Sequence, residues 1–194
     1  MALDDTMATH QTATRRTLAS LSRINLLHEL QEHGTRTITE LAEATGLHHN
    51  TAREHLHRLI GAGLVASEPI PVDQKGRPKL RYRATTGGAV PHTGQASSIR
   101  SPADEQLDTL GDHMSQCGFD AVIEADRQHM VMHDCPFAAL AHAHPQVCAV
   151  HFALVKGSLE STVGPVRARR LHPFFTQDDC IVDLESDADP GPAR

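Results

Sequence analysis

The spacing of apolar residues at the start of the chain predicts a helix over Arg15–His33. Leucine and isoleucine recur there every three or four residues, which places them on one face of a helix, and Gly34 follows where a C-terminal cap is expected. The residues before position 14 lack such a pattern. We therefore expect a disordered tail over residues 1–13, followed by a helical domain.

Two further short helices are predicted directly after this one. Thr37 and Glu40 have the spacing of a capping box, and Gly46 stands where the helix that they open should end. The next helix follows Leu47, with its apolar face at helical spacing. The residues predicted to form that face are Ala52, Leu56, Leu59 and Ile60.

The polar side chains of this last helix point away from its apolar face. A short helix with a polar leading edge, supported by a preceding helix, is the helix-turn-helix arrangement that fits the major groove of DNA. The simpler alternative is a pair of packed helices with a solvated polar face. The candidate DNA-contacting residues are His48, His49, Asn50, Thr51, Arg53 and His57.

A basic hairpin is predicted after the helices. One strand starts at Leu64–Ala66, residues 73–78 form a turn, and Leu80–Ala84 alternates as a half-buried strand should. Its tip would let Arg77 enter a narrow minor groove, where negative potential is concentrated. An ordinary basic surface hairpin is the alternative. The candidate DNA contacts of this hairpin are Lys75, Arg77 and Lys79.

Residues 15–85 as a whole resemble the winged helix-turn-helix of bacterial ArsR/DeoR-like repressors. The motif LAEATGLHHNTAREHLHRLIGAGLV and the wing GRPKLRYRAT carry this resemblance. It implies a winged-helix domain over residues 14–86 that binds double-stranded DNA.

Charge is distributed unevenly between the two halves of the 194-residue chain. The net charge is −6, yet residues 10–85 hold 11 Lys or Arg against 7 Asp or Glu. The first half is thus the one suited to phosphate. No apolar run is long enough to span a membrane, and the first residues lack the features of a secretory signal. We expect a cytoplasmic protein, in which cysteines are thiols or ligands rather than disulfides.

The second half is predicted to be a separate unit. A Gly/Ser/Pro-rich linker over residues 87–102 precedes a small α+β sensor and dimerisation domain over residues 103–184, and an acidic tail over 185–194 follows. The fold class is therefore α+β. Helices are expected over 103–117, 136–144 and 147–162, and strands over 120–125, 130–133, 166–171 and 181–184.

Three cysteines of this unit fall at the ends of predicted elements. They are Cys135, Cys148 and Cys180. His151 lies three residues after Cys148, so the two side chains share a helix face. Three thiolates and an imidazole can bind a tetrahedral metal ion or an iron–sulfur cluster. The spacing is also compatible with cysteines that are simply buried in an aliphatic core.

The cysteine-containing segment resembles the sensor half of actinobacterial regulators related to the repressors of iron–sulfur cluster assembly operons. The strings CPFAALAHAHPQVCAVHFALVKGSL and LHPFFTQDDC carry the resemblance. It implies an iron–sulfur cluster bound by Cys135, Cys148 and Cys180. His151 is the candidate fourth ligand, and Cys117 is the competing choice.

These features predict a DNA-binding transcriptional regulator, a repressor by the resemblance, that acts as a homodimer and senses iron or redox state. The first alternative is a regulator with a purely structural zinc. The second is a protein-interaction adaptor that does not bind DNA. An enzyme is not expected, because the chain has no Gly-rich phosphate loop, HExxH motif or nucleophile elbow.

Overall fold

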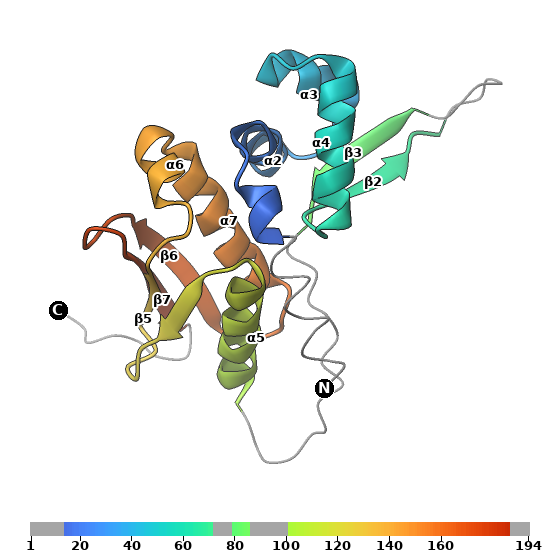
Figure 1. Cartoon of the computed structure of the whole chain (residues 1–194). Coiled ribbons are helices and arrows are strands. Elements are labelled where there is room, and N and C mark those ends of the chain that lie inside the picture. The colour runs from blue at the N-terminus through green and yellow to red at the C-terminus, as the bar shows by residue number, and fades with distance from the viewer. Residues whose placement is uncertain (1–13, 72–78, 86–100, 187–194) are drawn as a thin grey trace, which may run out of the picture.

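The computed structural model describes residues 14–71, 79–85 and 101–186 (Figure 1). Helices and antiparallel sheets alternate along the chain, which confirms the α+β class. The elements are α2 (Leu21–His33), β1 (Arg36–Thr37), α3 (Ile38–Thr45), α4 (His49–Gly61), β2 (Val65–Pro69), β3 (Leu80–Ala84), α5 (Pro102–Gln116), β4 (Asp120–Ile123), β5 (His129–His133), α6 (Ala138–Ala143), α7 (Gln146–Glu160), β6 (Val166–His172) and β7 (Cys180–Ser186).

The single helix predicted over residues 15–33 is wrong, because the chain breaks it at Ser20. Ser20 has an extended backbone with φ −125° and ψ 120°, and α2 starts after it. The guanidinium of Arg23 reaches back across the break, where its Nε donates to the Thr17 carbonyl at 2.6 Å and its terminal nitrogen to the Arg16 carbonyl at 2.9 Å. The side chain thus satisfies carbonyls at the end of the first helical turn. The apolar residues keep their helical spacing on both sides of Ser20, so their pattern gave no sign that the helix is interrupted there.

The helix-turn-helix pair forms as predicted. Thr37 accepts a bond from the Glu40 backbone while the Glu40 carboxylate accepts one from the Thr37 N–H, so the capping box opens α3. Gly46 ends α3 in the left-handed region at φ 67°. Of the four residues predicted to form the apolar face of α4, three are fully buried and Ile60 is half-buried.

The first sheet has the order β1-β3-β2 and is antiparallel. Strand β3 has the predicted bounds, and β2 runs from Val65 through Pro69. The two-residue strand β1 was not predicted, since its partner Tyr82 lies more than 40 residues away. The tip of the hairpin, with Lys75 and Arg77, lies outside the described residues.

In the second half, α5 and α7 cover one face of a sheet with the order β4-β5-β7-β6 (Figure 1). Ser101 and Asp104 form a capping box, so Ser101 and Pro102, which were predicted to end the linker, belong to α5 and its cap. Strand β7 continues to Ser186, so its last two residues are not part of the predicted acidic tail.

Helix α6 begins two residues later than predicted. Pro136 was expected at its first position, but Pro136 lies in a turn that is closed by a hydrogen bond from the Ala138 N–H to the Cys135 carbonyl at 3.0 Å. This turn holds the Cys135 backbone at the end of β5, and the helix follows it.

Helix α7 packs directly against α2, so the two halves are joined by more than the segment between β3 and α5. At the edge of this contact the Gln146 amide donates to Asn25 Oδ1 at 3.4 Å. Buried side chains of both halves belong to one continuous hydrophobic core.

In the described part of the chain, every helix is too short or too polar to cross a membrane.

Candidate nucleic-acid interface and cysteine cluster

The outward face of α4 carries the predicted DNA-contacting residues. His48 caps the helix, because its Nδ1 accepts a hydrogen bond from the Asn50 N–H at 3.3 Å. Arg53 donates to Asn50 Oδ1 at 3.0 Å, which holds the guanidinium beside the amide on the exposed surface. Thr51 and His57 are also exposed, and His49 is half-buried. The structure thus brings Asn50 and Arg53 together as one polar pair.

The wing adds basic side chains to this surface. Lys79 is exposed directly before β3. In the same strand Arg81 pairs with Glu68 of β2 at 3.7 Å, and Arg83 is exposed. Tyr82 between them is buried, and burial raises the pKa of its hydroxyl. Alternation along β3 therefore points the two arginines outward and the tyrosine into the core.

A basic group behind α4 was missed by sequence reasoning. It consists of Arg23 on α2 together with His55 and Arg58 on α4. The pKa of His55 is lowered by its burial and by both arginines, and its Nδ1 is buried without a hydrogen-bond partner among the described residues. Arg23 lies on another helix, more than 30 residues before His55, so the spacing along α4 gave no signal for the group.

Three of the four cysteines lie together at one end of the second sheet. Cys135 follows β5 and its N–H donates to the Asp178 carbonyl at 2.9 Å, while Cys180 opens β7 opposite Met132. Cys148 lies in the first turn of α7. All three are free thiols. The structure therefore assembles the three predicted ligands from three separate elements.

The thiols of this cysteine cluster (Cys135, Cys148 and Cys180) influence one another's ionisation. Burial, together with the repulsion from Cys180 and Cys135 that a thiolate would feel, raises the pKa of Cys148 to about 11. Burial is also the main reason that the pKa of Cys135 is raised, with Cys180 contributing. The cluster is therefore a set of protonated thiols that a soft metal cation would convert to thiolates.

His151, the candidate fourth ligand, lies in the core. Its ring contacts Phe119 edge-on, with 4.7 Å between ring centroids, and Phe137 at 5.1 Å. The side chain is 3% exposed, and Nε2 has no hydrogen-bond partner among the described residues. Burial lowers its pKa to about 3, so the imidazole is neutral and one of its two nitrogens has a lone pair free to bind a metal.

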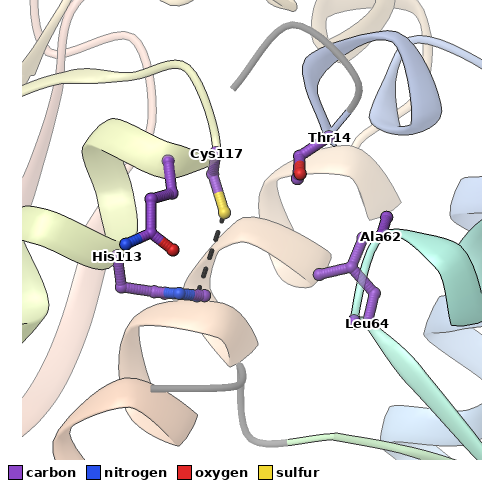
Figure 2. Close-up of a pocket in the computed structure, with 7 residues that line it drawn as sticks. Thr14, Ala62, Leu64, His113 and Cys117 are labelled. Atoms are coloured by element: carbon purple, nitrogen blue, oxygen red, sulfur yellow. Dashed lines mark hydrogen bonds between the residues drawn. The ribbon is translucent and has the colours of Figure 1, made fainter. Parts of the chain in front are cut away.

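Cys117, the competing choice, is not part of the cysteine cluster. Its Sγ lies 3.8 Å from His113 Nε2, and the pair faces the loop after α4 across a small cavity (Figure 2). Burial raises its pKa to about 12. The cavity is lined by Thr14, Ala62, Gly63, Leu64, His113, Gln116 and Cys117. This cysteine thus lies where the two halves of the protein meet.

The donor set of the cysteine cluster fits a soft metal group. Cys148 is half-buried, which leaves a route to solvent, and the orphaned Nε2 of His151 lies on the next turn of the same helix. Within the described residues, the three sulfur atoms do not all lie within 4.8 Å of one another. Around one zinc ion, with Zn–S bonds of about 2.3 Å, tetrahedral geometry places sulfurs about 3.8 Å apart. The three thiols are therefore not held at the spacing of a closed zinc site.

A second group of possible ligands was not predicted. Glu124, Asp126 and His129 have ligand atoms within 4.8 Å of one another at the turn between β4 and β5. His129 Nδ1 lies 3.1 Å from Asp126 and 3.6 Å from Glu124, and Asp126 also accepts from the Gln128 N–H at 2.8 Å. Ion pairing and turn formation account for this exposed arrangement.

Comparison with known proteins supports the predicted helix-turn-helix domain. The family model described as a helix-turn-helix domain matches residues 18–68, which cover α2, α3, α4 and most of β2. No curated protein matches the chain. The match does not reach β3 or the cysteine cluster. It supports a helix-turn-helix regulator that binds DNA.

Proposed function

We propose that this protein is a homodimeric transcriptional repressor whose second half binds an iron–sulfur cluster through Cys135, Cys148 and Cys180. The observation that carries the proposal is the direct packing of α7 against α2. Helix α7 bears one of the three cysteines, and α2 lies behind the helix-turn-helix pair. A change at the cysteines therefore has a short physical route to the DNA-binding helix.

The DNA-binding role rests on α4 and the wing. Asn50 and Arg53 are held together on an exposed helix face, and both residue types read base edges in the major groove. The outward arginines of β3 can contact phosphates, which position the protein without reading sequence. This division assigns base recognition to α4 and non-specific affinity to the wing.

The sensing role rests on how the cysteine-bearing loops are held. The loop before Cys180 is tied to the end of β5, because the Asp134 N–H donates to Asp179 Oδ1 at 3.1 Å and the Cys135 N–H donates to the Asp178 carbonyl. Cys135 and Cys180 can thus shift as a unit relative to α7. An iron–sulfur cluster, when bound, would supply redox chemistry that the side chains lack.

Two alternatives make different predictions. A structural zinc would use the same thiols, drawn closer together around one ion. An adaptor that does not bind DNA would show no steep dependence of DNA affinity on salt, whereas a protein that neutralises several phosphates loses affinity steeply as salt rises. A salt titration of operator binding distinguishes the adaptor from the regulator.

Arg53→Ala should weaken binding to the operator by about 1–3 kcal/mol and relax sequence specificity, because its guanidinium can bond two acceptors on one base. Affinity for random DNA should change much less. The measurement is fluorescence anisotropy with operator and random duplexes at one fixed salt concentration. The operator is first found by selection from a random DNA pool.

Arg53→Lys is the matched control for this experiment. It keeps the positive charge but cannot make the paired hydrogen bonds of a guanidinium. We expect it to restore affinity for random DNA and not the preference for the operator. Equal losses on both duplexes for Arg53→Ala would exclude base reading by this residue.

A further inference from the structure

The second sheet has one face that no described element covers. Helices α5 and α7 pack on the other face (Figure 1). From this geometry we infer that the open face is the homodimer interface, with a second copy of the chain packed face to face on it. The inference deepens the proposed function, because it locates the dimer contact that a regulator of this kind needs.

The open face has an apolar row between charged rows. The strand register aligns Val122, Val131 and Ile181 across β4, β5 and β7, with His172 of β6 at the end of the row. Val122 is 49% exposed, and the other two aliphatic residues are half-buried. Residues on the opposite face of the same strands, such as Met130 and Val182, are fully buried in the core. The aliphatic row is therefore available to a partner.

The two outer strands of this face carry charges of opposite sign. The β4 edge carries Asp120 and Glu124, with Asp126 in the following turn. The β6 edge carries Arg167 and Arg170, with Arg169 at a bulge and paired to Glu185 at 2.7 Å. Arg170 lies opposite Asp183 of β7 in the strand register, and Asp183 pairs with His172 at 2.8 Å. The contrast in charge is therefore between the two outer strands, β4 and β6, with acidic side chains of β7 beside the basic strand.

The two edges of the sheet are poorly suited to pairing with another sheet. Strand β4 has four residues, and β6 has a bulge between Ala168 and Arg170 together with three arginines. Short strands, bulges and charges are the usual devices that block strand addition at an edge. Association through the face is therefore favoured over edge pairing.

Twofold symmetry decides how two such faces can meet. If the axis runs parallel to the strands, β4 of one copy lies over β6 of the other, so each acidic edge faces a basic edge. Val131 then faces Ile181 of the partner subunit, and Glu124 faces the partner's Arg170. If the axis runs across the strands, β4 lies over β4 and like charges meet. Charge complementarity selects the first arrangement.

Glu124 and Arg170 are suited to a decisive test because they cannot meet within one protomer. They lie on the two outer strands of the four-stranded sheet, which are separated by three strand spacings, or about 14 Å. Any compensation between substitutions at these positions must therefore act between protomers.

The experiment is sedimentation velocity of the full chain over a range of concentrations. Glu124→Arg and Arg170→Glu should each raise the dimer dissociation constant about tenfold or more, and the double charge swap should return it close to the wild-type value. Ile181→Glu should give a monomer, because it places a charge in the centre of the apolar row. Glu160→Arg, an exposed reversal at the end of α7, is the matched control and should leave association unchanged.

The outcomes separate clearly. A wild-type chain that stays monomeric up to its solubility limit overturns the interface, and so does a dimer that survives Ile181→Glu or is weakened further by the double swap. Circular dichroism checks that each variant folds, and the charge variants lie at exposed positions in case Ile181→Glu does not fold. DNA binding that depends on Arg53 would survive failure of this interface, so the two proposals fail independently.

Discussion

Cys148→Ser should abolish cofactor binding and leave a folded protein. Its side chain is half-buried and its thiol is one of the three in the cysteine cluster, so serine removes a ligand at little cost in packing. Wild-type protein purified without oxygen should be brown, with a broad absorption band at about 400 nm and bound iron. The variant should be colourless and iron-free. It should still bind the operator, but in one state that no longer responds to oxidant.

Cys117→Ser is the matched control, since Cys117 lies beside His113 and outside the cysteine cluster. It should keep both colour and iron. If the chain instead holds a structural zinc, wild-type protein is colourless and contains zinc, and Cys148→Ser lowers the melting temperature of the whole chain, because metal-binding free energy is then folding free energy and both halves share one core. A colourless, metal-free wild type with an unchanged oxidant response in Cys148→Ser would leave the cysteines as core residues.

Gln106→Leu should lower the free energy of unfolding by about 3 kcal/mol or more, since each buried polar group left without a partner costs about 1–3 kcal/mol. Gln106 is fully buried. Its amide donates to the carbonyls of Leu159, Thr162 and Val166, the closest at 2.9 Å, and its Oε1 accepts from the Val166 N–H at 2.7 Å. Leucine fills similar space and satisfies none of these groups. Urea denaturation measures the loss.

The reason for this large effect is the place that Gln106 occupies. It joins α5 to the end of α7 and the start of β6, so its loss should loosen α7, which also contacts α2. Gln116→Leu on the same helix is the control, because its side chain is only half-buried. Gly164→Ala should destabilise in the same way, since an added Cβ would overlap the Gln106 amide. A loss no larger than that of Gln116→Leu would show that the four hydrogen bonds contribute little.

Local chemistry was sufficient to predict most elements of this protein. The Thr37 capping box and the left-handed Gly46 fix the bounds of α3 through bonds between residues three or four apart. The alternation of Leu80, Tyr82 and Ala84 likewise gives β3. Periodicity failed at Ser20, because an Arg23 side chain that bonds backward to Thr17 replaces a helical turn without disturbing the apolar spacing.

The candidate site residues also fall into two groups, those predictable from local spacing and those that only the fold brings together. Asn50 and Arg53 could be assigned from spacing alone, because a helix places residues three apart on one face. The spacing of the cysteines could not show which of them lie together in the structure, because Cys135, Cys148 and Cys180 come from three elements. The sheet register and the start of α7 bring them together, and Cys117 is carried to the contact between the two halves.

The sequence by itself therefore determined the helix-turn-helix and the wing strand, and it supplied the candidate residues for binding DNA or metal. The tertiary structure decided the packing of α7 on α2, the sheet face left open and the separation of Cys117 from the other cysteines. These features depend on contacts between residues far apart in the chain. Such contacts follow from how whole apolar faces pack together, and no local pattern records them.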